Sequence, residues 1–344
     1  MKLKAGVLLI GALALAGMSP IAAAQTTLLL STFFPKGHTF TAKVLVPWAQ
    51  DVEKATNGAV KITFAPSSLG PPPVQMEMVQ KGVADISAQY TGLVPKRLQL
   101  LLLGEVPGVA TTSEAMSVSL WRTYEKYFKQ ADEFKGVKLL ALFVFPPQGF
   151  WGVTDKPILS IEALKEAKIA ATPGIHARAL GAVTTGVVAG PAFRYFGLVS
   201  KGTVDAYVAA TPIDVIGFNL ARYTKSLVKF QGIGTAGTFA LVLNEGKWNA
   251  LGAKLQAEVM QVSGEAAAHH MAAMDVAAAD DMKKLRAQGM KVIDAPAGYN
   301  AALKKAFAFI STDWIADADK KGVNGKAALE YYRSEQEKLA GSAK

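Results

Sequence analysis

Few side chains in this sequence have the type and spacing that catalysis or metal binding requires. The 344 residues include four histidines and no cysteine, which excludes a thiolate nucleophile and a disulfide framework. His269 and His270 are adjacent on an expected helix, where consecutive side chains point about 100° apart and cannot share a metal ion. The same spacing excludes Asp280 and Asp281 as a pair. We therefore expect no metal site.

One glycine-rich stretch resembles a nucleotide site by its letters. Residues 232–237 read Gly-Ile-Gly-Thr-Ala-Gly and match the dinucleotide fingerprint. The phosphate-binding form of this motif opens a helix, whereas these glycines precede an expected strand at 238–243, so we interpret them as a crossover between two lobes. The motifs of serine hydrolases, zinc proteases and P-loops do not occur. We predict a protein without catalytic residues or a cofactor; a secreted hydrolase is an alternative that turnover assays would test.

Aromatic and polar side chains at the ends of expected strands indicate a binding protein instead. Rigid lobes with a few such groups facing a cleft are typical of ligand sites. For Phe150 and Trp151, at the expected lobe crossing, packing in the core remains the alternative. The candidate ligand-binding residues of this kind are His38, Tyr90, Thr91, Phe150, Trp151, Thr211 and Phe218.

Alternating strand and helix patterns place these residues in an α/β fold. Each expected sheet is mixed or mostly parallel, with helices on both faces. The expected strands are 26–33, 60–66, 83–88, 138–145, 168–172, 185–189, 203–209 and 238–243. The expected helices are 40–55, 74–81, 113–132, 161–167, 177–184 and 192–201. Residues 247–288 contain no proline and predict a long helix across both lobes, with two consecutive helices as the alternative.

A chain of this length exceeds what one hydrophobic core usually supports, so we expect two lobes. The chain crosses between lobes more than once in this interpretation. The expected division is 1–24 for a signal peptide, 25–150 and 238–265 for lobe 1, 151–237 and 266–335 for lobe 2, and 336–344 for a C-terminal tail.

The N-terminal residues have the features of a secretory signal peptide. Lys2 and Lys4 precede an apolar stretch at about 5–16, and small residues at 22–24 predict cleavage between Ala24 and Gln25. We therefore expect export to the periplasm. The formal net charge of the full sequence is +10, but the basic residues are scattered among acidic ones, so we expect no nucleic-acid partner.

Short motifs occur along nearly the whole chain in a characteristic order. They are Thr56-Asn-Gly58, Leu69-Gly70, Gly82-Val-Ala-Asp-Ile86, Phe134-Lys-Gly136, Lys156-Pro-Ile158, Gly202-Thr-Val-Asp205 and Lys247-Trp-Asn249. In this order and spacing the chain resembles the solute-binding subunits of tripartite ATP-independent periplasmic (TRAP) transporters, the DctP family. The resemblance implies a two-lobe periplasmic binding protein (Venus-flytrap) fold. It also implies capture of a small organic acid by lobe closure and delivery to small and large membrane subunits. A subunit that presents its ligand to a sensor receptor is the alternative.

The clearest departure from that family is an alanine. The strand at 168–172 reads Lys-Ile-Ala, where relatives usually have Lys-Ile-Arg with an arginine that binds the carboxylate of the ligand. Ala170 therefore implies an atypically held ligand with an aromatic or apolar body. If that ligand has a carboxylate, we expect Arg178 or Arg194 to hold it.

Overall fold

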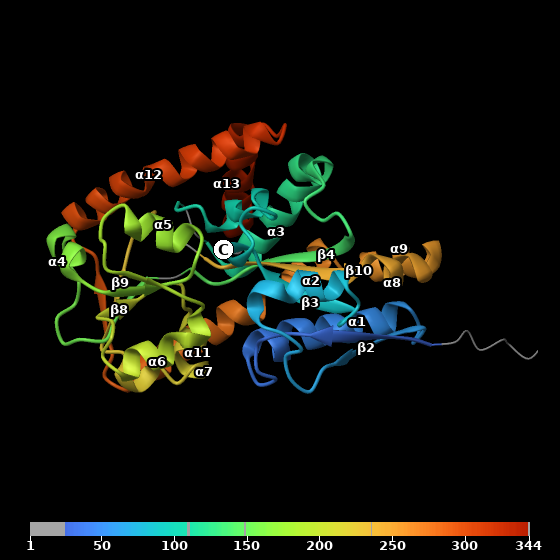
Figure 1. The fold of residues 1–344 in the computed structure, drawn as a ribbon, viewed down its shortest axis with the longest axis horizontal. Coiled ribbons are helices and arrows are strands. Elements are labelled where there is room, and N and C mark those ends of the chain that lie inside the picture. The colour runs from blue at the N-terminus through green and yellow to red at the C-terminus, as the bar shows by residue number, and fades with distance from the viewer. Residues whose placement is uncertain (1–24, 109–110, 148, 235, 343–344) are drawn as a thin grey trace, which may run out of the picture.

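The computed structural model describes residues 25–108, 111–147, 149–234 and 236–342, which form a two-lobe α/β protein with one sheet in each lobe (Figure 1). The expected signal peptide at 1–24 lies outside the described residues. Within the described ranges, no helix is both long and apolar enough to cross a membrane.

The first sheet has five strands in the order β2-β1-β3-β10-β4. Their bounds are β1 Thr26–Ser31, β2 Val60–Phe64, β3 Ile86–Tyr90, β4 Val137–Val144 and β10 Thr238–Asn244. Strands β1, β2 and β3 are parallel, and β10 inserts antiparallel between β3 and β4. The sheet is therefore mixed, and β10 places Phe239 opposite Tyr90 of β3.

The second sheet has six short strands in the order β11-β9-β5-β8-β6-β7. Their bounds are β5 Phe150–Gly152, β6 Ile169–Ala171, β7 Val187–Ala189, β8 Ala206–Tyr207, β9 Ser226–Lys229 and β11 Lys291–Asp294. The expected strands at 168–172, 185–189 and 203–209 contain β6, β7 and β8, whereas β5, β9 and β11 are absent from the sequence-based expectation. The residue boundaries of the two lobes stay a prediction.

Helices cover both sheets, and most begin or end within a few residues of the expected positions. A π-helical turn η1, Phe40–Leu45, leads into α1, and a 3₁₀ helix η7, Ala192–Arg194, leads into α6. The 3₁₀ helices η3, Thr91–Leu93, and η4, Leu100–Glu105, follow β3. The α-helices from α1 to α7 are α1 Val46–Ala55, α2 Gln75–Gln80, α3 Ser113–Thr123, α4 Ile161–Glu166, α5 Ile175–Gly181, α6 Tyr195–Ser200 and α7 Pro212–Gly217.

The expected long helix at 247–288 is wrong, as is its two-helix alternative. The segment forms α8 Glu245–Ala250, α9 Gly252–Gln261, α10 Glu265–His269 and α11 Ala272–Ala287. Two of its breaks lie at Gly252 and Gly264, whose φ angles of +74° and +56° are outside the helical region. A Cβ on Gly264 would also lie 2.5 Å from the Trp121 ring. The segment still joins the lobes, since α9 packs on α1 and α11 packs on α7.

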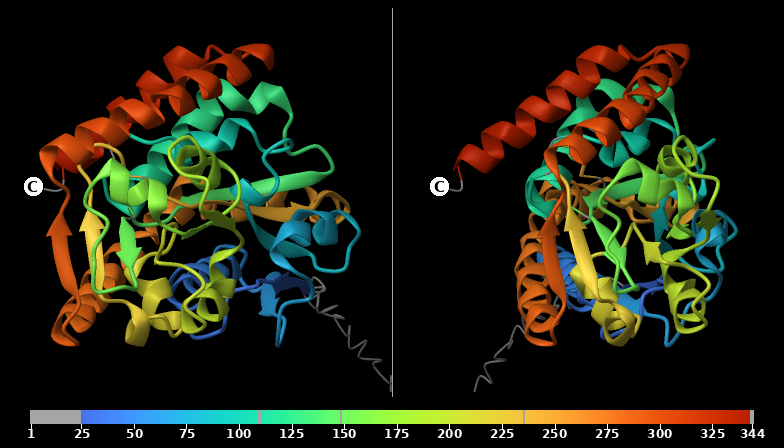
Figure 2. Two further views of the ribbon diagram at one scale, coloured as in Figure 1. Left: turned by 60° about the vertical axis from the view of Figure 1, so that its left-hand side comes forward. Right: turned by 90° about the vertical axis from the view of Figure 1, so that its left-hand side faces the viewer.

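A different segment provides the long helix. Helix α12, Ala297–Lys320, has 24 residues and is about 36 Å long. It contacts α4 and α5 of the second lobe and η4 of the first lobe. Helix α13, Gly325–Ser342, turns back onto α12 and α3, and Figure 2 shows both helices in red at the same end of the molecule. The two lobes are therefore held together by helices as well as by the strand crossovers.

Candidate ligand-binding site

A pocket between the two lobes is lined mainly by aromatic rings. The first lobe contributes residues beside β1, β3, β4 and β10, and the second contributes residues of η7, α7 and the end of β8. The lining residues are Phe33, Phe34, Pro72, Tyr90, Leu93, Phe145, Pro191, Ala192, Phe193, Ala209, Asp214, Phe218, Gly237 and Phe239. Seven of these are aromatic and none is lysine or arginine, so the wall of the pocket favours an apolar, flat group.

The pocket is narrow in this arrangement of the lobes. The cavity between its side chains has a volume of about 60 Å³. A ligand the size of one aromatic ring must therefore contact both lobes at once.

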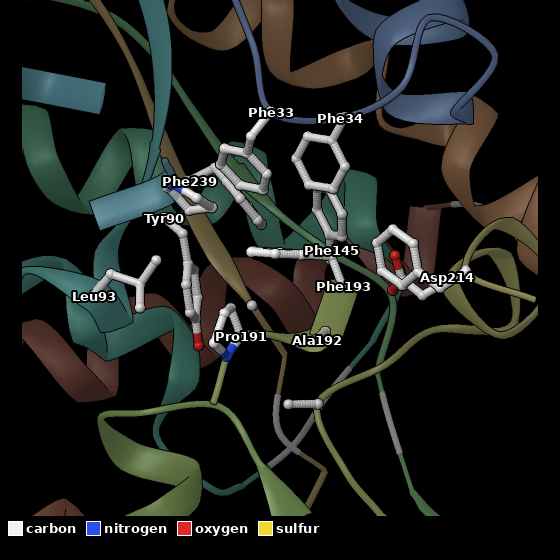
Figure 3. Close-up of a pocket in the computed structure, with 14 residues that line it drawn as sticks. Phe33, Phe34, Tyr90, Leu93, Phe145, Pro191, Ala192, Phe193, Asp214 and Phe239 are labelled. Carbon is white, nitrogen blue, oxygen red and sulfur yellow. The ribbon is translucent and has the colours of Figure 1, made fainter. Parts of the chain in front are cut away.

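Phe239 is the central ring of the first-lobe wall. Its ring centroid lies 4.4 Å from that of Phe145, 5.3 Å from Tyr90 and 5.5 Å from Phe34, and Phe33 stacks on Phe34 at 4.5 Å. The antiparallel register of β10 with β3 and β4 produces this grouping, because it brings Phe239 opposite both strands near their ends. Rings packed in this way form a wall with fixed side-chain positions (Figure 3).

The second-lobe wall carries the one acidic side chain of the lining, Asp214. Its Oδ2 accepts hydrogen bonds from the backbone N and the Oγ1 of Thr211, both at 2.7 Å, in a capping box at the start of α7. Its Oδ1 lies 3.2 Å from Nε2 of His38, a first-lobe residue whose ring packs on Phe34 at 4.5 Å. Asp214 thus links the lobes beside the pocket.

Backbone strain occurs at the same wall. Ala209, directly after β8, has a φ of +58°, a left-handed conformation that is uncommon for a residue with a Cβ. Such conformations persist where the surrounding structure enforces them, and they gather at ligand sites. The strained turn leads directly to Thr211 and the start of α7.

A buried polar cluster lies beneath the Tyr90 end of the pocket. The Tyr90 hydroxyl is 3.1 Å from Thr172 Oγ1 and 3.4 Å from Glu105 Oε2. Thr172 Oγ1 is in turn 3.0 Å from His176 Nδ1. Burial raises the pKa of the Glu105 carboxyl to about 8 and lowers the pKa of His176 to about 4, so both side chains are mainly uncharged near neutral pH. The cluster thus has hydroxyl groups and little net charge.

Of the predicted site residues, Tyr90 and Phe218 lie on the pocket wall, and three others support it. His38 and Thr211 hold Asp214, while Thr91 Oγ1 donates to Glu105 Oε1 at 2.9 Å. Their contact with a ligand stays a prediction.

Three further predicted residues lie in the core of the second lobe. Trp151 Nε1 donates to the Ala210 carbonyl at 2.8 Å, and its ring is parallel to that of Tyr207 at 6.2 Å. Ala170 is fully buried in the same hydrophobic cluster. Phe150 packs edge-on against Phe230 at 4.8 Å. None of the three is among the residues that line the aromatic pocket, because β5 and β6 direct them into the packed sheet.

The two predicted arginines also lie away from the lining. Arg178 is half exposed on α5 and pairs with Asp313 of α12 at 2.6 Å. Arg194 is exposed at the end of η7. Most of the lining residues that sequence reasoning missed lie where strands begin or end, so the search for aromatic side chains at strand ends could have found them. The missed residues are Phe33, Phe34, Phe145, Phe193, Asp214 and Phe239.

Comparisons with known proteins agree with this geometry. The model of the family described as bacterial extracellular solute-binding protein, family 7, matches residues 30–316. A curated relative from Comamonas testosteroni, named outer membrane transporter protein TsaT, is 36% identical over 327 residues, 95% of each chain.

Two solved structures are close in fold. A TRAP periplasmic solute-binding protein from Bordetella bronchiseptica with bound (R)- and (S)-mandelate is 28% identical, covers 91% of this chain and 99% of its own, and has a TM-score of 0.87. One from Rhodoferax ferrireducens with copurified benzoate is 24% identical, covers 93% and 100%, and has a TM-score of 0.83. The sequence-based resemblance is thereby confirmed, and the chain belongs to the family 7 bacterial extracellular solute-binding proteins, the binding subunits of TRAP-type transport.

Proposed function

We propose that this protein captures a small aromatic acid in the pocket between its lobes. The observation that carries the proposal is the lining, in which seven aromatic side chains surround a narrow space between the lobes. The mandelate-binding relative supports this ligand class, since its ligand combines one aromatic ring with one carboxylate. Stacking of each ring on a ligand ring contributes about 0.5–1.5 kcal/mol beyond area burial, so several such contacts provide micromolar affinity.

The acid group of the ligand is expected at the Tyr90 end of the pocket. Figure 3 shows Tyr90 and Asp214 on opposite sides, with Phe33, Phe34 and Phe145 between them. A carboxylate beside Asp214 would meet a second negative charge, whereas the Tyr90 side offers hydroxyl groups. The buried Tyr195 hydroxyl of the second lobe has no hydrogen-bond partner among the described residues. Neutral donors thus replace the arginine that is absent at Ala170.

Short aliphatic dicarboxylates should bind weakly to such a site. A hydrogen bond to a charged group contributes about 1.5–3 kcal/mol, and a dicarboxylate has no ring to compensate for a missing arginine. Its second carboxylate would also lie closer to Asp214. An aromatic monoacid avoids both costs.

The remaining parts of the proposal follow from the family. We propose export to the periplasm with cleavage between Ala24 and Gln25, two lobes with the boundaries given above, and delivery of the ligand to small and large TRAP membrane subunits. Transport by vesicles that contain those subunits, measured with and without this protein, separates delivery from presentation to a sensor receptor.

A panel of ligands tests the proposed specificity. Thermal shift and calorimetry would compare mandelate, benzoate and 3-hydroxybenzoate with cyclohexanecarboxylate, benzamide and succinate. A ligand at 100 times its Kd stabilises the folded protein by about 2.7 kcal/mol, which gives a clear thermal shift. We expect the aromatic acids to bind at least tenfold more tightly than cyclohexanecarboxylate or succinate. Preference for succinate over every aromatic acid would contradict the proposal.

A further inference from the structure

Glu105 is a completely buried carboxyl group whose partners are all neutral hydrogen-bond donors. It accepts from Thr91 Oγ1 at 2.9 Å and from the backbone N of Thr238 at 3.4 Å, and the Tyr90 hydroxyl lies 3.4 Å away. Among the residues that the structure describes, the one ionisable nitrogen within 4 Å of this carboxyl group is His176 Nδ1, at 3.9 Å from Oε2. A charged carboxylate in such surroundings would be unfavourable, since no cation compensates for its lost hydration.

The charged side chains of the helices packed against η4 have partners of their own. Those helices are α3, α5 and α12. The pairs are Arg122 with Glu265 and Glu335, Glu114 with His269, Arg178 with Asp313, and Asp317 with Lys320. Asp319 accepts from the Gly325 backbone, while Lys304 and Lys305 are on the outer part of α12. Strand β10 and helix η3 carry no charged residue. Among the described residues, none of these charges is a partner of Glu105.

In this arrangement of the lobes, residues of the second lobe help to cover Glu105. Thr91, Tyr90 and Thr238 belong to the first lobe, but Thr172 and His176 follow β6 of the second lobe, and α5 packs directly against η4. Next to them, Gly174 approaches Gly92 so closely that a Cβ would lie 3.0 Å from the Gly92 carbonyl oxygen. Separation of the lobes would remove this cover and admit water to the carboxyl group.

We propose that closure of the lobes on a ligand takes up one proton at Glu105, so that the acid ligand binds together with a proton. The proton keeps the Tyr90 end of the pocket free of a second negative charge and thereby compensates for the absent arginine. The protonation of Glu105 does not depend on the proposed function. The one part of this inference that rests on the proposed function is the negative charge of the ligand.

The direction of the pH dependence follows from the two buried groups. The closed state holds the Glu105 proton up to about pH 8, whereas an exposed glutamate loses it near its ordinary value of 4.5. Binding therefore weakens as pH rises from 6.5 to 8, by about tenfold over this range. His176, with its pKa lowered to about 4, opposes closure only below pH 6.5, where it becomes charged in the open state. The range from pH 6.5 to 8 thus reports on Glu105.

A ligand-free experiment tests the proton site first. Urea unfolding of the wild type should show stability that falls from pH 6.5 to pH 8, and Glu105→Gln, which resembles the protonated carboxyl, should remove that slope. Glu335→Gln is the matched control, because Glu335 is also buried but pairs with Lys338 and Arg122, which lower the pKa of its carboxyl group. It should reduce stability at every pH and keep the slope. Equal slopes in the wild type and Glu105→Gln would overturn the proton site.

The coupling to closure is measured on the same proteins. Because the chain has no cysteine, spin labels at Lys54→Cys and Lys201→Cys report the distance between lobes. The closed fraction should fall with rising pH in the wild type and stay constant in Glu105→Gln; a pH-independent closed fraction in the wild type would overturn the coupling. Calorimetry with mandelate in phosphate and Tris buffers should show proton uptake at pH 7 that increases with the open fraction of the ligand-free protein, up to one proton. Absence of mandelate binding, with the Glu105-dependent slopes retained, would count against the proposed ligand and not against the proton site.

Discussion

Phe193 offers the cleanest test of the aromatic pocket. It lines the pocket from η7, yet it is 41% exposed. Among the described residues, its one aromatic or cation–π partner is the neighbouring Arg194. Phe193→Ala should therefore reduce folding stability little, within about 0.5 kcal/mol. Its effect should appear in ligand binding instead.

The size of that effect can be worked out from the exposed area. A phenylalanine presents roughly 200 Å², so its exposed part is about 80 Å², and a ligand that covers half of it gains about 1 kcal/mol. Ring pairing adds about 0.5–1.5 kcal/mol, giving a total of about 1.5–2.5 kcal/mol, or one to two decades in Kd. Calorimetry with mandelate measures this loss.

The matched control lies three residues further along the chain. Phe196 is 40% exposed, but it is not a lining residue and its ring packs on Tyr223 at 6.0 Å. Phe196→Ala should leave the Kd for mandelate within twofold of the wild type. An equal loss in both variants, or none in Phe193→Ala, would refute the placement of the ligand ring in this pocket.

Three further substitutions test other parts of the account. Gly174→Ala should weaken ligand binding at least tenfold in calorimetry, because Gly174 has a φ of +87° and its added Cβ would press on Gly92 across the lobe interface. Unchanged affinity would mean that this contact is not needed for closure. Asp214→Asn should lower the free energy of unfolding by about 1–2 kcal/mol in urea titrations, since the amide cannot accept every hydrogen bond of the carboxylate. An unchanged unfolding midpoint would show that the capping box contributes little to folding stability. Arg178→Ala should change the Kd for aromatic acids by less than twofold, because Arg178 is half exposed and paired on the outer face of α5; a tenfold loss would place the carboxylate on that arginine.

The sequence predicted the fold well wherever a segment was long enough to show a period. The α/β architecture, the first-sheet strands and the return of β10 all had clear apolar patterns. The long-helix prediction was based on the absence of proline in 247–288, but the helix breaks at Gly252 and Gly264, which have positive φ angles. The close approach of the Trp121 ring to Gly264 is a tertiary contact that the sequence does not show.

The candidate site was predicted less completely, for a physical reason. Tyr90 was found because it ends a buried strand, but Phe239 stands at the start of a strand, and its pairing with Tyr90 depends on the antiparallel insertion of β10. Trp151 and Ala170 stand at positions that suggest a cleft, yet the second sheet packs them into the core. Glu105 gave no signal in sequence, since its burial depends on helices from both lobes.

The most direct test of the central claim is a crystal structure of the protein with mandelate bound. The account predicts the ligand ring between Phe145, Phe193 and Phe239, with the carboxylate on the Tyr90 side and no lysine or arginine within hydrogen-bonding distance. A carboxylate held by Arg178, Arg194 or another basic side chain, with the aromatic pocket empty, would contradict it.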